Sequence, residues 1–191
     1  MKLFVVGAGG HGLDVADIAR ACGWSPVFLD DRDPPGVVGR PSELAGRDWP
    51  CVIAVNDPTT RARLAVGGSP VTLVHPTAVV SESATLMPGV VVGAGTQIGP
   101  DTIIGSHTHI GPGCTVTRTS IGPFCSIAPG VDIAGDVLIG SGTSIGVGAR
   151  IANLRTIGAD ATIGAGAVVV DDVRMGETVA GVPAKVLHQW V

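Results

Sequence analysis

The sequence predicts two domains, an α/β domain with a parallel sheet over residues 1–74 and a parallel β-helix over residues 75–191. Strand and helix patterns alternate in the first domain, which is typical of βαβ units. From Val80 onward an aliphatic residue returns at every sixth position. Gly accounts for 29 of 191 residues and aromatic residues for 3%, a composition that suits a narrow coil with glycine at its corners and branched aliphatics inside.

The first domain starts with a short apolar strand at residues 2–6, which leads directly into the glycine-rich segment Gly7–Gly12. A helix is expected next, because apolar residues recur at helical spacing until Gly23 can end it. Further strands are expected at residues 26–29, 51–55 and 71–74. A second helix is expected after Asn56, and it carries Arg61 and Arg63. This order indicates a parallel sheet with right-handed crossovers.

The second domain is defined by its repeated aliphatic positions. They are Val80, Leu86, Val92, Ile98, Ile104, Ile110, Val116, Ile121, Ile127, Ile133, Ile139, Ile145, Ile151, Ile157, Ile163 and Val169. A six-residue period over this length indicates a parallel β-helix, because neither an α-helix nor a hairpin sheet repeats at six. One spacing is five residues instead of six, between Val116 and Ile121.

Composition and charge disfavour several classes of function. The formal net charge is -4 with 12 basic residues, which is not the footprint of a nucleic-acid-binding protein. The four cysteines form no CxxC pair and predict buried thiols in a reducing compartment, with neither a metal site nor disulfides. No apolar run approaches the roughly 18 residues of a membrane span, and the N-terminus does not resemble a signal peptide. A cytoplasmic protein without a membrane partner is therefore expected.

The segment Gly7–Gly12 contains the pattern G-x-G-x-x-G between a strand and a helix, and Asp30 follows about twenty residues later. Glycines in this pattern let backbone N–H groups approach a pyrophosphate at the helix N-terminus. About four strands are too few for a complete dinucleotide fold, so a single nucleotide with its pyrophosphate fits better than NAD. An NAD-binding module fused to a structural β-helix and a tight turn without a ligand are the alternatives.

Together these motifs resemble the hexapeptide-repeat acyltransferases built on a left-handed β-helix, in particular the sugar acyltransferases of bacillosamine, perosamine and sialic-acid biosynthesis. The resemblance is carried by the hexads and by Gly7–Gly12, Leu29–Asp31, Val74–Ala78 and Gly181–Lys185. It implies a homotrimer whose first domain is Rossmann-like and holds a nucleotide-linked amino sugar, with acetyl-CoA between neighbouring coils. The last motif closes the coil in this family, and residues 187–191 are expected to cover its open end.

The resemblance also implies binding residues for both substrates and no metal. For the nucleotide-linked amino sugar they are Gly9, Gly10, His11, Asp30, Asp31, Asn56 and Arg61. For CoA they are Ser126, Val147 and Ala165.

The general base of the family is a histidine, which the resemblance places in the hexad that starts at Val116. In this chain that hexad is one residue short and contains Arg118 instead, and a guanidinium stays protonated and cannot act as a base. Three interpretations stay open. His107 or His109 acts as the base; or positioning alone sustains slow N-acylation, since a general base contributes typically ~10²–10⁴-fold; or catalysis is lost and the protein is a binding or scaffold protein.

Overall fold

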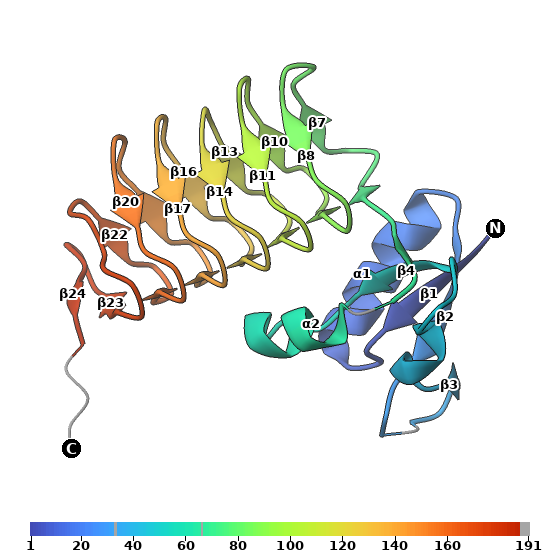
Figure 1. The fold of residues 1–191 in the computed structure, drawn as a ribbon. Coiled ribbons are helices and arrows are strands. Elements are labelled where there is room, and N and C mark those ends of the chain that lie inside the picture. Colours follow the sequence, from blue (N-terminus) through green and yellow to red (C-terminus); the bar gives the residue numbers. More distant parts are fainter. Residues whose placement is uncertain (33, 66, 188–191) are drawn as a thin grey trace.

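The structure is a computed structural model that describes residues 1–32, 34–65 and 67–187. It consists of an N-terminal α/β domain beside a long coil of short strands, with α2 on the side of the domain that faces the coil (Figure 1). The expected fold class, a Rossmann-like domain followed by a left-handed parallel β-helix, is confirmed.

The N-terminal domain has a five-stranded parallel sheet in the order β3-β2-β1-β4-β5. Its elements are β1 (Lys2–Val6), α1 (Gly10–Ala21), β2 (Ser25–Leu29), β3 (Val37–Gly39), the 3₁₀ turn η1 (Pro41–Leu44), β4 (Pro50–Ile53), α2 (Pro58–Leu64) and β5 (Ser69–Pro70). Helix α1 covers one face of the sheet, because Val15 and Ala19 pack against Leu3 and Val5 of β1. A second apolar cluster that includes Leu44 forms on the opposite face.

The coil is built from strands of mostly two residues that stack into three sheets, in which all pairs but β23–β24 are parallel. One sheet has the order β22-β19-β16-β13-β10-β7, a second has β20-β17-β14-β11-β8, and the third has β24-β23-β21-β18-β15-β12-β9-β6. The strands are β6 (Leu73–Val74), β7 (Val79–Val80), β8 (Thr85–Leu86), β9 (Val91–Val92), β10 (Gln97–Ile98), β11 (Ile103–Ile104), β12 (His109–Ile110), β13 (Thr115–Val116), β14 (Ser120–Ile121), β15 (Ser126–Ile127), β16 (Asp132–Ile133), β17 (Leu138–Ile139), β18 (Ser144–Ile145), β19 (Arg150–Ile151), β20 (Thr156–Ile157), β21 (Thr162–Ile163), β22 (Val168–Val169), β23 (Thr178–Ala180) and β24 (Lys185–Val186).

Every strand from β7 to β22 ends on one of the aliphatic residues that define the hexapeptide repeat. From Val92 onward these side chains are buried in one continuous core, and Val80 and Leu86 pack against its first turn. Small hydroxyl side chains complete the interior, as where Thr108 Oγ1 donates to the carbonyl of Gly122 at 2.8 Å. The period-six pattern is thus confirmed as the pattern of inward-facing residues.

The single five-residue spacing leaves the strands undisturbed. Ile121 still pairs with Ile104 of the preceding turn, and Val116 still pairs with Ile98. The missing residue is taken out of the corner between β13 and β14, where Arg118 adopts a left-handed backbone conformation with φ 43°. The coil therefore keeps its register, and the change is confined to one turn.

The segment at residues 71–74 differs from the expected fourth strand of the first domain. The strand β5 precedes it and completes the N-terminal sheet, whereas β6 pairs in parallel with β9 of the coil. The reason is that Leu73 and Val91 pack into the same apolar cluster as the buried face of α1. This apolar run therefore joins the two domains. At the other end β23 and β24 form an antiparallel pair, and residues 188–191, expected to cover the coil, lie outside the described residues.

Candidate functional site

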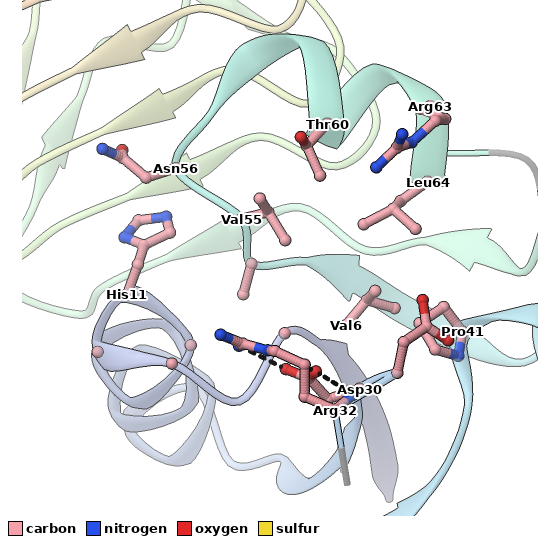
Figure 2. A pocket seen from close by; sticks show the side chains of 16 residues that line it. Val6, His11, Asp30, Arg32, Pro41, Val55, Asn56, Thr60, Arg63 and Leu64 are labelled. Atoms are coloured by element: carbon pink, nitrogen blue, oxygen red, sulfur yellow. Dashed lines mark hydrogen bonds and ion pairs between the residues drawn. The ribbon is translucent and has the colours of Figure 1, made fainter. Parts of the chain in front are cut away.

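A pocket of about 500 Å³ lies at the carboxyl ends of β1, β2 and β4. Ligands of open α/β sheets bind at this edge, and the volume is within the range of small-molecule sites. Figure 2 shows the pocket between the start of α1, the end of β2 and helix α2. Its lining includes these predicted ligand residues: Gly9, Gly10, His11, Asp30, Asp31 and Asn56.

The glycine-rich segment shapes one wall of this pocket. Gly7 has φ +107°, and a Cβ atom there would lie 2.7 Å from the carbonyl oxygen of Ala54, so only glycine fits. Helix α1 begins at Gly10, and its N-cap Gly9 offers no side chain to cap the first turn. The unpaired N–H groups of that turn are therefore open to a ligand, and a helix N-terminus favours an anion.

Asp30 and Arg32 form an ion pair at the end of β2. The Asp30 carboxylate is 7% exposed and accepts hydrogen bonds from the backbone N–H of Ala8 at 2.9 Å and from Arg32 Nη2 at 2.9 Å. Its second oxygen accepts from the backbone N–H and Nε of Arg32. The Arg32 guanidinium, assisted by these N–H groups, holds the pKa of Asp30 well below its usual range. Asp30 is therefore ionised and engaged with the protein, and it holds Arg32 in place.

Arg32 is a pocket residue that sequence reasoning missed. Its guanidinium lies beside the glycine-rich segment, since a Cβ atom on Gly9 would be 3.7 Å from Nη2. In dinucleotide-binding folds an arginine near the acidic residue after the second strand accommodates the 2′-phosphate of NADP. The position of Arg32, two residues after Asp30, could therefore have identified it as a phosphate ligand from the sequence. Thr60 and Arg63 of α2 also line the pocket and were likewise not singled out as ligand residues.

Arg61, a predicted ligand residue, does not line the pocket and lies in the junction between the two domains. It is 0% exposed. Its Nη1 donates to the carbonyls of Val55 at 2.6 Å and Asn56 at 3.3 Å. Its Nη2 donates to three groups at the start of β15: the carbonyls of Phe124 and Cys125 in the preceding corner and the hydroxyl of Ser126 in the strand, at 2.9, 2.8 and 2.9 Å. Burial lowers the pKa of Arg61 to about 10, so the side chain is a buried cation at neutral pH.

A pair of histidines also bridges the two domains. His11 Nε2 lies 2.7 Å from His109 Nδ1 of β12. His109 is 3% exposed, whereas His11 is half-buried at the pocket edge. His107 is stacked on the ring of Phe124, with 5.3 Å between centroids. Burial, followed by the charge of Arg61, lowers the pKa of all three imidazoles, which keeps them neutral near pH 7.

The predicted CoA residues are dispersed within one chain. Ser126 is 8% exposed, and its hydroxyl also hydrogen-bonds the carbonyl of Asn56 at 2.6 Å, within the domain junction. Val147 and Ala165 are exposed at the corners after β18 and β21. Arg118 lies at another corner, with Nη2 3.5 Å from Asp136 Oδ2. The geometry therefore brings together the sugar-nucleotide candidates other than Arg61, whereas the CoA candidates lie apart.

Within residues 1–32, 34–65 and 67–187, no cluster of three or more His, Cys, Asp or Glu side chains could hold a metal ion. Over the same residues, neither helix has the length and apolarity needed to cross a membrane.

Two family models match the chain. Residues 2–66 match the PglD N-terminal domain, and residues 83–118 match the bacterial transferase hexapeptide (six repeats). Among curated proteins, UDP-3-O-acylglucosamine N-acyltransferase of Caulobacter sp. (strain K31) is 37% identical over 71 residues. That match spans 37% of this chain and 21% of the enzyme's length.

Two examples represent the solved structures that resemble the whole chain. One is a histidine-to-alanine variant of GDP-perosamine N-acetyltransferase from Caulobacter crescentus, in complex with CoA and GDP-perosamine. It is 35% identical with a TM-score of 0.92, and the match covers 99% of this chain and 98% of that one. The other is the acetyltransferase domain of PglB from Neisseria gonorrhoeae FA1090 in complex with acetyl coenzyme A. It is 36% identical with a TM-score of 0.91, covering 97% of this chain and 98% of that one.

Replacing Arg61 is expected to destabilise the protein, because several carbonyls at the domain junction would lose their charged donor. Hydrogen bonds to charged groups contribute about 1.5–3 kcal/mol each and are not additive. We expect Arg61→Ala to lower the free energy of unfolding in urea by at least about 3 kcal/mol. The control is Arg63→Ala in the same helix, which removes an exposed guanidinium and is expected to change it by less than about 0.5 kcal/mol. Equal effects of the two variants would contradict this role.

Proposed function

Since this chain belongs to the hexapeptide-repeat sugar acyltransferases, we propose that it transfers the acetyl group of acetyl-CoA to the amine of a nucleotide-linked amino sugar. The observation that carries the proposal is the pocket at the start of α1, where free N–H groups and the Arg32 guanidinium face the same space. This combination suits a diphosphate. Similar proteins of known structure bind CoA with GDP-perosamine, or acetyl coenzyme A.

The pocket supports a distinct role for each group around the sugar nucleotide. The N-terminus of α1 and Arg32 bind the diphosphate, and Asp30 keeps the guanidinium aimed at it. Asp31 and Asn56 are exposed at the rim and are free to bind hydroxyl groups of the nucleotide or sugar. His11 marks the edge nearest the coil. The amino group of the sugar is therefore expected at that edge.

The reaction requires a neutral amine next to the thioester carbonyl. The amine nitrogen forms a bond to that carbonyl carbon, the C–S bond breaks, and the amine proton is transferred to the departing thiolate. Holding both reactants in line supplies a large part of the rate enhancement. Ser126, Val147 and Ala165 remain the proposed CoA contacts, and their separation within one chain is consistent with a CoA site completed by a neighbouring subunit. A cytoplasmic location remains part of this proposal.

A binding or scaffold protein of the same architecture is the second candidate. It is favoured by one observation, that Arg118 occupies the expected position of the family base and pairs with Asp136 on the surface. An arginine there can bind an anion but cannot accept a proton.

We expect the protein to release free thiol from acetyl-CoA only when a suitable acceptor is present. The assay is incubation with acetyl-CoA and a panel of UDP-, GDP- and dTDP-linked amino sugars, with the thiol followed by absorbance and the acetylated product by mass spectrometry. The same sugar nucleotides without an amino group are the control. Binding of both substrates by calorimetry without turnover of any acceptor would favour the scaffold alternative. Binding of NADH without binding of any sugar nucleotide would contradict the pocket assignment.

Removing the Arg32 side chain is expected to weaken binding of the diphosphate. A charge-assisted hydrogen bond is worth about 1.5–3 kcal/mol, so we expect Arg32→Ala to raise the Kd for the sugar nucleotide about 10- to 100-fold. Arg32→Lys should recover part of the affinity, because it keeps the charge without the fork of donors. Arg20→Ala is the control, since Arg20 is exposed near the far end of α1. An unchanged Kd in Arg32→Ala would exclude the phosphate contact.

We further propose a homotrimer in which the sheet containing β8, β11, β14, β17 and β20 faces the neighbouring subunits. Its outward residues carry no charge, and Ile103 and Leu138 are 50% and 56% exposed. The sheet containing β13 instead presents the Arg150–Asp132 ion pair.

We expect light scattering to give three times the chain mass of 19.1 kDa for the wild type. Leu138→Lys should shift the protein towards monomer, because it places a charge in the apolar contact. Thr115→Lys, on the neighbouring sheet, should leave the trimer intact. A monomeric wild type, or a trimer that survives Leu138→Lys but not Thr115→Lys, would contradict the assignment.

A further inference from the structure

The histidine pair at the domain junction joins the sugar-nucleotide pocket to the coil. His11 belongs to the first turn of α1, and His109 stands on the outward face of β12. Their ring nitrogens are 2.7 Å apart, although the residues are 98 positions apart in the sequence. The ring centroids are 5.0 Å apart with a tilt of 37°, so the contact is an edge hydrogen bond and not a stack.

The two imidazoles differ in their access to a ligand. His109 is buried, so it cannot reach a bound sugar without displacing the N-terminal domain. His11 lines the pocket at the side where Asn56 also lies (Figure 2). Its Nε2 is engaged by His109, and no other hydrogen bond among the described residues occupies its ring. His11 Nδ1 is the nitrogen that remains for a ligand.

We propose that His11 is the catalytic base that accepts the proton of the acceptor amine, and that His109 is the positioning residue that holds its ring and fixes its tautomer. This inference rests on the proposed acetyl transfer. It assigns to the junction the role that Arg118 cannot fill, because a guanidinium does not accept a proton. Acceptance at Nδ1 requires the tautomer in which His11 Nε2–H donates to His109 Nδ1.

The proton transfer balances without any further reactant. The amine nitrogen forms its bond to the thioester carbonyl carbon, and its proton passes to Nδ1 of His11. The C–S bond then breaks, and the same proton is passed from His11 to the leaving thiolate, which departs as the free thiol of CoA. His11 returns to its neutral form with the proton of Nε2 still shared with His109. A base held in place by a second group is the arrangement of other acyl-transfer sites.

The charges around the pair keep His11 ready to accept a proton. Burial lowers the pKa of His11, the Arg61 guanidinium lowers it further, and Asp14 of α1 opposes them. The pKa of His109 is lowered by burial, by Arg61 and by the two other imidazoles, His11 and His107. A lowered pKa also makes the protonated His11 a stronger acid, and the protonated ring therefore gives its proton to the leaving thiolate more readily. Protonation of His11 is therefore expected to add a loss of activity below the ordinary histidine pKa of 6.5, beyond the loss that protonation of the acceptor amine causes at higher pH.

His107 is less suited to either role. Its ring is stacked on Phe124 with a 4° tilt and is 8% exposed. It does not line the sugar-nucleotide pocket. His107 packs against the ring of Phe124 at the corner before β12.

The test compares kinetic constants and pH profiles of four variants of the full-length protein. His11→Gln retains a group that can hydrogen-bond His109 but is not basic, and it is expected to lower kcat about 10²–10⁴-fold with a small change in KM for the sugar nucleotide. It should also remove the part of the acidic limb of the kcat/KM profile that lies below pH 6.5, and leave the part that comes from protonation of the acceptor amine. His109→Ser places a serine on β12, as Ser126 already does at the paired position of β15. Its side chain is too short to reach His11, so it should lower kcat and shift that limb. His109→Asn restores a polar group near Nδ1 and should recover much of kcat.

His75→Asn is the matched control, because His75 is half-buried and its ring hydrogen-bonds Thr77 of the same loop. An unchanged kcat and acidic limb in His11→Gln would overturn the proposal, as would a His109→Asn variant no better than His109→Ser. Nitrogen-15 NMR of the imidazoles supplies a readout that does not depend on turnover. A protonated Nδ1 on His11 in the neutral wild type at pH 7 would also overturn it. A wild type that binds the sugar nucleotide but never acetylates it would instead refute the proposed function.

Discussion

The buried guanidinium of Arg61 is the interaction on which the arrangement of the two domains depends. Arg61 belongs to the two-turn helix α2 of the N-terminal domain. Its guanidinium donates hydrogen bonds to backbone carbonyls of its own domain and of a corner of the coil. Its charge is met in this junction by carbonyl oxygens and one hydroxyl, so its burial is favourable only while those groups stay in place. The side chain therefore fixes the corner at Phe124–Ser126 against the loop that follows β4.

This constraint also determines the state of the histidines. Docking of the N-terminal domain buries His109 and brings His11 within hydrogen-bond distance of it. Burial, and after it the fixed positive charge of Arg61, makes a further proton on these imidazoles unfavourable. A group that anchors the domains thus has an electrostatic consequence in the pocket, because its charge adds to burial in keeping two adjacent imidazoles neutral where an acyl transfer needs a proton acceptor. The same corner carries Ser126, whose hydroxyl is used for the junction.

The corner at Arg118 shows how a repeat tolerates change without loss of fold. A coil of stacked two-residue strands is held by its strand pairs, and one residue can leave a corner while the pairs on either side remain in register. Functional side chains at the corners can therefore change without loss of the fold. That exposed corner is distinct from the pair of His11 and His109, and the domain junction places His11 at the pocket.

The sequence by itself determined the repeat, the α/β order and the glycine-rich wall of the pocket, because these depend on local periodicity and on glycines at the end of a strand. The inward residues of the coil could be named individually, and so could Gly9, Gly10, His11, Asp30, Asp31 and Asn56 of the pocket lining. Arg32 was recoverable from its position beside Asp30 but was missed. Only the tertiary structure decided that Arg61 anchors the junction, that residues 73–74 begin the coil, and that His11 meets His109. These contacts join segments up to 98 positions apart, and docking of one domain on the other creates them, so no periodicity in the chain encodes them.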